Sequence, residues 1–240
     1  MASAKPTTVL PPVSEKRTYV RRMFTAIAGS YDLMNRLMTL GRDAVWRRTV
    51  VKLCALPQGG RLLDVATGTG DIAFEALRAD PSARPVGLDL TPQMMRTGQG
   101  KYAGLTFPFI EGDALALPFD AGVFDAACSG FMMRNVVDIA AAFREQVRVV
   151  KSGGKVVCLE LTLPRTPIFG RLFRLYFFRL VPVMGGLISG QRDAYRYLPE
   201  SVAVFPPPAE LARTMQLTGL RDVQYRLAML GTVAIHWGTK

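Results

Sequence analysis

Short apolar runs alternate with longer amphipathic segments through the middle of the chain. Runs of this kind between turns are typical of strands buried on both faces of a parallel sheet. The runs predicted as such strands are 61–66, 85–89, 107–111, 124–129 and 155–161. The segments predicted as helices are 71–79, 92–102 and 138–150. This alternation predicts an α/β fold with a doubly wound, mostly parallel sheet.

The C-terminal part of the pattern predicts an antiparallel addition to this sheet. A helix is expected at 207–218, and the runs 223–227 and 232–237 are joined by a turn at Leu230-Gly231. They predict a hairpin at the sheet edge, which brings the sheet to about seven strands.

The N-terminal part has a different composition. Residues 1–14 are rich in Pro, Thr, Ala and Ser and predict a flexible tail. Residues 15–52 predict a helical lid with a break near Gly41, in which the Ser30 hydroxyl caps the second helix. We expect residues 15–240 to form one domain, into which an amphipathic insert is placed at 164–190.

Composition narrows the class of protein. Apolar residues make up 49% and charged residues 20% of the chain, which excludes wholesale disorder, collagen and coiled coil. A net charge of +11 allows nucleic acid, an anionic membrane surface or an acidic protein as a partner. Cys54, Cys128 and Cys158 lie far apart, so neither a disulfide framework nor a metal site is predicted and a cytoplasmic location is expected. The proline-rich N-terminus does not resemble a secretory signal.

The most informative motif is a glycine loop between the first strand and the next helix. Gly68 and Gly70 let the backbone turn tightly, and free N–H groups at the helix start favour negative ligand groups. Asp89 ends the next predicted strand, where an acid can accept hydrogen bonds from the ribose hydroxyls of a nucleotide-like cofactor.

Two cofactors fit such a loop. Gly68-x-Gly70-x-x-Ala73 matches the dinucleotide fingerprint of NAD. Asp64 stands at the start of the loop, however, where a carboxylate suits a cationic amino group better than a pyrophosphate. Asp113 follows the third strand and can accept a hydrogen bond from an adenine amino group. Acids at successive strand ends favour S-adenosylmethionine over NAD.

Several motifs, in order, resemble the UbiE/MenG family of quinone C-methyltransferases. The resemblance runs from residue 16 to residue 240. The segments that carry it are Tyr31-Asp32-Leu33-Met34-Asn35, Arg134-Asn135-Val136, the stretch 148–160, the stretch 195–202 and Val233-Ala234-Ile235-His236. The resemblance implies a Rossmann-like methyltransferase that transfers a methyl group from S-adenosylmethionine to a polyprenyl quinol. The implied reaction is demethylmenaquinol to menaquinol, the last step of menaquinone biosynthesis.

The resemblance also implies residues that contact the cofactor. They are Thr69, Asp89 and the pair Asp113-Ala114, which join Asp64, Gly68 and Gly70 from the loop itself. The family has a serine that contacts the cofactor before a Phe-Gly-Leu-Arg-Asn segment. Here Gly130 stands in its place, and Ser129, one position earlier, is the candidate for this contact. Asp43 stands where the family pattern has histidine.

The implied chemistry points to catalytic candidates. A phenol ionises near pH 10, so the site must supply a base or stabilise the phenolate. We expect Arg134 to stabilise the developing negative charge or to hold a water that carries the proton away. Asn135 can orient the quinol oxygen, and Tyr31 can belong to a lid over the cofactor.

Each candidate also has a structural interpretation. Arg134 can pair with a surface carboxylate, Asn135 can cap the helix after residue 136, and Tyr31 can be packing. Glu160 and Tyr195 are further candidates for the pocket. A lone histidine in a strand-like run, such as His236, is more often structural.

The insert at 164–190 alternates arginines with aromatic and aliphatic residues. It can pack on the sheet as a lid, or it can form an entrance for the prenyl tail while its arginines face lipid head groups. No stretch reaches the roughly 18 uninterrupted apolar residues of a membrane-spanning helix. We therefore expect peripheral contact with the cytoplasmic face of an anionic membrane, and a homo-oligomer is possible.

Three other functions remain open at this point. The acceptor can be a polyprenyl methoxybenzoquinol of ubiquinone biosynthesis. The basic charge also suits a nucleic-acid methyltransferase, but the chain has no N/D-P-P-Y/F motif and no Pro-Cys nucleophile. Asp43 and Gly130 keep open a module that binds S-adenosylmethionine without catalysis.

Overall fold

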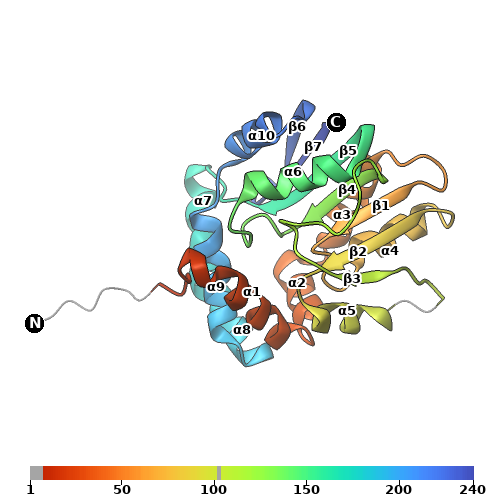
Figure 1. Ribbon diagram of the computed structural model, residues 1–240. Helices are drawn as coiled ribbons and strands as arrows, with labels where there is room; N and C mark the ends of the chain where they lie inside the picture. Colours follow the sequence, from red (N-terminus) through yellow and green to blue (C-terminus); the bar gives the residue numbers. More distant parts are fainter. Residues whose placement is uncertain (1–7, 102–103) are drawn as a thin grey trace, which may run out of the picture.

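The centre of the molecule is a sheet of seven strands in the order β3-β2-β1-β4-β5-β7-β6 (Figure 1). The computed structural model describes residues 8–101 and 104–240. The strands are β1 Arg61–Val65, β2 Arg84–Asp89, β3 Phe109–Glu111, β4 Phe124–Gly130, β5 Val150–Leu161, β6 Arg221–Ala228 and β7 Val233–Thr239. Strands β1 to β5 pair in parallel, and β7 lies antiparallel between β5 and β6. The predicted doubly wound sheet with its antiparallel hairpin is confirmed.

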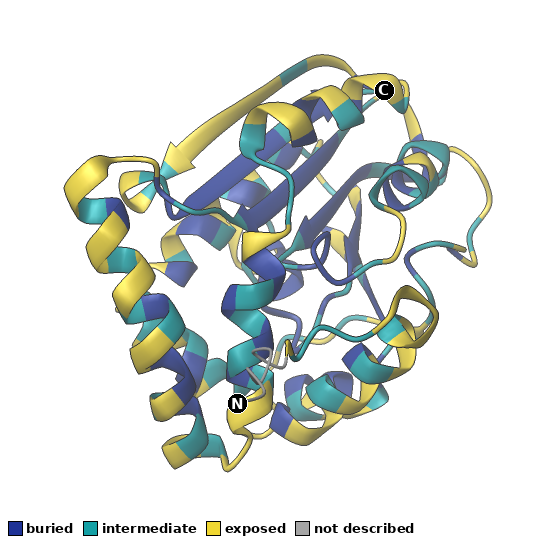
Figure 2. Ribbon diagram, turned by 90° about the vertical axis from the view of Figure 1, so that its left-hand side faces the viewer, coloured by how far each residue is buried: buried dark blue, intermediate teal, exposed yellow. Residues whose placement is uncertain are grey.

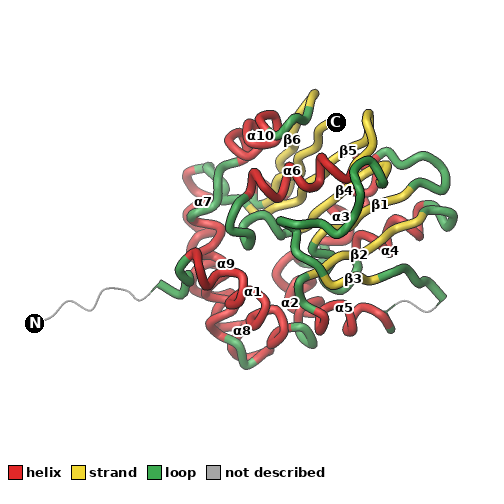
Figure 3. Tube along the Cα trace, viewed as in Figure 1, coloured by secondary structure: helices red, strands yellow, loops and turns green. Residues whose placement is uncertain are grey.

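Helices cover both faces of the sheet (Figure 3). They are α1 Val13–Ile27, α2 Tyr31–Thr39, α3 Asp43–Cys54, α4 Asp71–Ala79, α5 Pro92–Gln99, α6 Ile139–Val149, α7 Pro167–Leu175, α8 Val181–Ser189, α9 Arg192–Ala203 and α10 Pro208–Leu217, with a π-helix η1 at Tyr176–Leu180 and a 3₁₀ turn η2 at Met229–Gly231. The central strand β1 is buried on both faces, because Leu62, Leu63 and Val65 have no exposed surface. That burial is why apolar residues fill this strand except at its exposed start, Arg61, and at the buried Asp64.

Three hydrophobic clusters result from this arrangement. One joins the sheet to α6 and α10, and a second joins it to α3 and α4. The third lies beyond the sheet, where Ile27, Met34, Phe177, Val181 and Tyr195 pack helices α1, α2, η1, α8 and α9 together. The predicted lid and the predicted insert therefore share one apolar core.

The predicted lid differs from the structure in its details. It consists of α1, α2 and α3, and α1 begins at Val13, inside the predicted tail; residues 1–7 of that tail lie outside the described part. The break near Gly41 is confirmed, since Gly41 has φ +74°. The capping role of Ser30 is wrong, because its hydroxyl donates to the Ile27 carbonyl at 3.2 Å instead of accepting an N–H group of α2.

The insert is a single continuous helix from Pro167 to Ser189, formed by α7, η1 and α8. By length and composition it is apolar enough to cross a membrane, which corrects the expectation that the chain has no such segment. Only 22% of its most apolar window is buried. Helix α9 was not predicted, since Pro199 within it is a residue that usually ends a helix.

Candidate functional site

The glycine loop between β1 and α4 uses a backbone conformation that favours glycine. Gly68 and Gly70 have φ values of +58° and +86°. A Cβ atom at Gly70 would lie 2.8 Å from the Phe107 ring, so no side chain fits there. The N–H group of Gly68 donates to Asp89 Oδ2 at 2.8 Å, which ties the loop to the end of β2.

A cavity of about 110 Å³ opens beside this loop. Predicted cofactor residues line it: Gly68, Asp89, Asp113 and Ala114, and so does Gly130. They meet because the carboxyl ends of β1, β2, β3 and β4 share one edge of the sheet. Burial raises the pKa of Asp89 above its ordinary value, although hydrogen bonds from the backbone of Gly68 and Thr91 act in the opposite direction.

The other predicted cofactor residues lie next to this cavity without lining it. The Asp64 carboxylate is buried under the loop, where it accepts hydrogen bonds from Thr67 Oγ1 at 2.7 Å and from Ala73 N at 3.3 Å. Burial raises the pKa of Asp64 to about 7. Thr69 donates to Asp32 Oδ1, and the fully buried Ser129 hydroxyl has no partner in the described part of the chain. Contact of Asp64, Thr69, Gly70 or Ser129 with a cofactor stays a prediction.

Helix α1 covers this cavity. Arg17 pairs with Asp113 at 2.8 Å, and Arg21 pairs with Glu111 at 2.8 Å. Val20 of the same helix lines the cavity. The helical lid thus closes over the strand ends through ion pairs at its exposed side.

A second cavity, of about 410 Å³, lies between the sheet and the helices α1, α2, α7, η1, α8 and α9. Its wall is mainly aromatic and aliphatic, and includes Phe169, Phe173 and Tyr176 of the long helix. Four residues line both cavities: Phe24, Tyr31, Phe131 and Asn135. The two spaces are therefore separated by a common wall.

Arg134 places a positive charge in this mainly apolar cavity. Its Nη1 donates to Glu160 Oε2 at 2.8 Å, and the side chains of Arg134 and Glu160 are only 6% and 1% exposed. The buried Nε of Arg134 has no partner among the described residues. The alternative of a surface ion pair is thus wrong, because the partner carboxylate is buried on the neighbouring strand β5.

Asn135 is held beside Arg134 by hydrogen bonds on both sides of its amide. Nδ2 donates to the Phe131 carbonyl at 3.0 Å, and Oδ1 accepts from the Tyr197 hydroxyl at 3.2 Å. The alternative that Asn135 caps the next helix is wrong, because Asp138 caps α6 by accepting from Ala141 N.

Tyr197 is a pocket residue that the sequence pattern does not indicate, although Tyr195, two positions earlier, is a candidate. Both line the apolar cavity, which places them on one wall. Burial raises the pKa of Tyr197 to about 12, so its hydroxyl remains a neutral donor to Asn135. Nothing in the sequence pattern marks Tyr197 as different from Tyr195, because its partner is distant in the chain.

The remaining candidates have clear positions. Tyr31 packs against the third hydrophobic cluster and also lines both cavities. Asp43 lines the apolar cavity and pairs with Arg47. His236 lies away from both cavities on β7, where Nε2 is 2.9 Å from the Pro208 carbonyl oxygen and its ring stacks on Tyr225. Its surroundings agree with a structural role.

These features suit transfer of a group between two ligands. The cavity at the strand ends, whose wall includes the acids Asp89 and Asp113, adjoins a larger apolar cavity with one buried cation, and four residues line both. An apolar ring with an ionisable oxygen fits the larger space, and a nucleotide-like donor fits the smaller one.

Comparison with known proteins agrees with this arrangement. The chain is 52% identical to the demethylmenaquinone methyltransferase of Roseiflexus castenholzii over 98% of both chains. It is 42% identical to the ubiquinone/menaquinone biosynthesis C-methyltransferase UbiE of Geobacter sulfurreducens, over 95% of this chain and 91% of that one. The fold resembles a SAM-dependent methyltransferase from Thermotoga maritima, with a TM-score of 0.62 and 19% identity over 91% of this chain and 99% of that one.

A model of the ubiE/COQ5 methyltransferase family matches residues 12–240, nearly the whole chain. With the relatives above, this match identifies an enzyme that transfers methyl groups. The chain belongs to the ubiE/COQ5 methyltransferase family.

Proposed function

We propose that the protein methylates a ring carbon of demethylmenaquinol with S-adenosylmethionine and so completes menaquinone biosynthesis. The observation that carries the proposal is the buried Arg134 in an apolar cavity that shares a wall with the cavity at the strand ends. An apolar bicyclic ring with two oxygens needs such a combination of apolar walls and one fixed charge.

The smaller cavity fits S-adenosylmethionine in the chemistry of its walls. Asp89 offers carboxylate oxygens for ribose hydroxyls, and Asp113 offers one for an adenine amino group. The donor supplies an activated methyl group on a sulfonium. The residues of this chain hold it and bring the acceptor carbon to it, which removes much of the entropic barrier.

Arg134 and Asn135 act on the acceptor. The quinol carbon becomes nucleophilic when the neighbouring hydroxyl loses its proton to a water, and a fixed guanidinium stabilises the phenolate that results. Because the pair Arg134–Glu160 is shielded from water, the field of the guanidinium at a nearby oxygen is stronger than at the surface. Asn135, fixed by Phe131 and Tyr197, orients the same oxygen.

The test is methyl transfer from labelled S-adenosylmethionine to reduced demethylmenaquinone in detergent micelles. Reduced polyprenyl methoxybenzoquinone and total RNA are assayed in parallel. We expect label in the naphthoquinol, and loss of roughly 100-fold in kcat on Arg134→Met, as for other electrostatic groups. Label in RNA alone, or a fully active Arg134→Met enzyme, contradicts the proposal.

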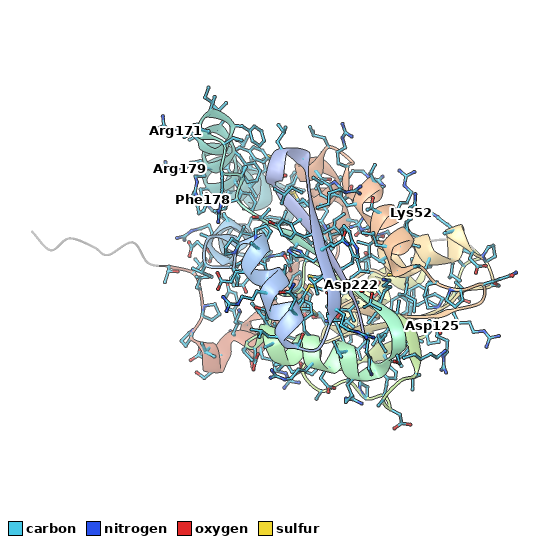
Figure 4. The ribbon with its side chains drawn as sticks, turned by 90° about the horizontal axis from the view of Figure 1, so that it is seen from above. Lys52, Asp125, Arg171, Phe178, Arg179 and Asp222 are labelled. Atoms are coloured by element: carbon cyan, nitrogen blue, oxygen red, sulfur yellow. The ribbon has the colours of Figure 1, made fainter. Side chains whose placement is uncertain are left out.

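We also propose that the long helix α7–η1–α8 docks on the anionic surface of a membrane. Ile168, Leu175 and Leu187 of this helix are exposed, and Figure 2 shows extensive exposed stretches on the helices at this end of the molecule. Its arginines include Arg171 and Arg179, which point away from the body of the molecule in Figure 4. No acidic residue lies between Glu160 and Asp193.

The contacts on the inner side of the same helix support the proposal that the helix lies on the membrane surface and does not cross the membrane. Phe169, Phe173 and Tyr176 line the apolar cavity, so the helix is part of the acceptor site. A prenyl tail could then pass from lipid to the cavity along one helix. We propose peripheral attachment at the cytoplasmic face.

Vesicle flotation tests the docking proposal. Binding is expected to rise with the fraction of anionic lipid and to fall with salt. Replacing Arg171, Arg174 and Arg179 by Gln should reduce binding on the order of 100-fold, since each cation near such a surface contributes roughly 1 kcal/mol. Lys52→Gln on α3 is the control for the single variant Arg179→Gln, because each removes one positive charge and Lys52 lies far from this helix (Figure 4). Binding that ignores lipid charge, or equal losses in both single variants, refutes the proposal.

A further inference from the structure

A polar network lies between the lid and the glycine loop. Asp32, on α2, accepts a hydrogen bond from Thr69 Oγ1 at 2.8 Å and pairs with Lys101 Nζ at 2.7 Å. Lys101 also donates to Thr69 Oγ1 at 3.1 Å and pairs with Asp71 at the start of α4. The three residues Asp32, Thr69 and Lys101 thus contact one another.

The network continues to the next lid helix. Asp71 Oδ2 pairs with Arg47 Nη1 at 2.8 Å, and Arg47 pairs with Asp43 on the same helix α3. The side chains of these pairs are between 7% and 32% exposed. At that depth, ion pairs are screened by salt much less than surface pairs. Both α2 and α3 are therefore fixed to the loop that borders the smaller cavity.

The position of Asp32 in the chain connects this network to both ligand sites. Tyr31 precedes it and lines both cavities. Gly68 precedes Thr69 and lines the smaller cavity. The hydrogen bond between Thr69 and Asp32 therefore connects the loop to Tyr31, with a single peptide unit at each end.

We propose that Asp32 is a positioning residue that couples the two sites, so that occupation of the smaller cavity by the methyl donor strengthens binding of the apolar acceptor. The identity of the two ligands rests on the proposed function. A ligand that contacts the loop fixes Thr69, Thr69 fixes Asp32, and α2 then holds Tyr31 in the common wall. Linkage requires the acceptor to strengthen donor binding by the same factor.

The coupling can be measured without turnover. S-adenosylhomocysteine has no methyl group to transfer, and oxidised demethylmenaquinone has no hydroxyl proton to lose. The dissociation constant of the quinone in detergent micelles is measured with and without saturating S-adenosylhomocysteine. For the unchanged protein we expect the quinone to bind about tenfold more tightly in its presence, within the usual range of such couplings.

Two variants break the network from opposite sides. Asp32→Ala removes both contacts and should reduce the coupling factor to about one. Lys101→Met removes the cation but leaves the hydrogen bond between Thr69 and Asp32, so it should lower the factor only in part. Asp32→Asn keeps an oxygen for the Thr69 hydroxyl and should restore part of the coupling, which a simple folding defect would not allow. Lys151→Ala is the matched control. It removes another Lys–Asp pair, formed at 2.6 Å with Asp125 (labelled in Figure 4) at the start of β4, and should keep the tenfold factor. The glycine loop lies at the opposite end of the neighbouring strand β1.

The outcomes separate the inference from the proposed function. Coupling in the unchanged protein that survives in Asp32→Ala, or that is undiminished in Lys101→Met, overturns the inference. Absence of coupling in the unchanged protein, when both ligands bind, also overturns it. Failure of the unchanged protein to bind S-adenosylhomocysteine or the quinone overturns the proposed function, and the inference with it.

Discussion

The buried pair Arg134–Glu160 gives a prediction in which stability and catalysis can be separated. Glu160→Gln keeps the shape of the side chain and one acceptor oxygen, but it leaves the Arg134 guanidinium without its counter-charge in a site that is almost closed to water. Removing one partner of such a pair costs about 3 to 5 kcal/mol of unfolding free energy. For a chain of this length, each kcal/mol lowers the melting temperature by roughly 2 to 4 °C. We therefore expect a decrease of about 6 to 20 °C.

The assay is urea unfolding of Glu160→Gln, Arg134→Met and the double variant. The double variant has no unpaired charge, so it should recover at least about 2 kcal/mol relative to Glu160→Gln, while methyl transfer stays low because the guanidinium is absent. A loss under about 1 kcal/mol in Glu160→Gln would refute the argument from burial. Strictly additive effects of the two substitutions would refute the pairing itself.

Three further predictions concern other parts of the molecule. The pKa of Asp64 is 3.8 ordinarily and about 7 in the folded protein, so its contribution to stability is full below about pH 4 and is lost as the pH rises through 7. Urea unfolding between pH 5 and 8 should show this decline in stability, and Asp64→Asn should make the pH dependence flatter. Gly185→Ala would place a Cβ atom 2.1 Å from the Tyr195 ring and should lower the free energy of unfolding by about 1 to 3 kcal/mol. In Gly186→Ala the new Cβ atom would lie 3.3 Å from the nearest atom, on Arg192, so this variant should be neutral or slightly stabilising in thermal unfolding. Tyr197→Phe removes the donor to Asn135 and should lower kcat/KM for the quinol about fivefold with little change in donor affinity, as the loss of one neutral hydrogen bond implies; equal losses for both ligands would contradict this.

The sequence is most informative where structure is local. Strand, glycine turn and helix follow one another from Arg61 to Ala79, and parallel pairing then brings Asp89 and Asp113 to one sheet edge. These residues could be predicted because each depends on the neighbouring turn and on a general rule of sheet topology.

Contacts between distant segments could not be predicted in this way. Glu160 on β5 pairs with Arg134 after β4, and Asp32 meets Thr69 across 37 positions of the chain. Neither pair has a periodic signature, since a single buried partner is decided by how the helices pack. The Ser30 hydroxyl shows the same limit at short range, because a serine before a helix can also donate backwards.

The common wall has a consequence for how enzymes of this architecture can diverge. A substitution at Phe24, Tyr31, Phe131 or Asn135 alters both binding spaces at once, so a change that suits a new acceptor also disturbs the methyl donor. Residues that line the larger space alone carry no such conflict, and many of them lie on the long helix and around η2, such as Phe169, Leu172 and Met229. New acceptor preferences should therefore arise by variation at that outer wall, while the inner wall stays nearly constant.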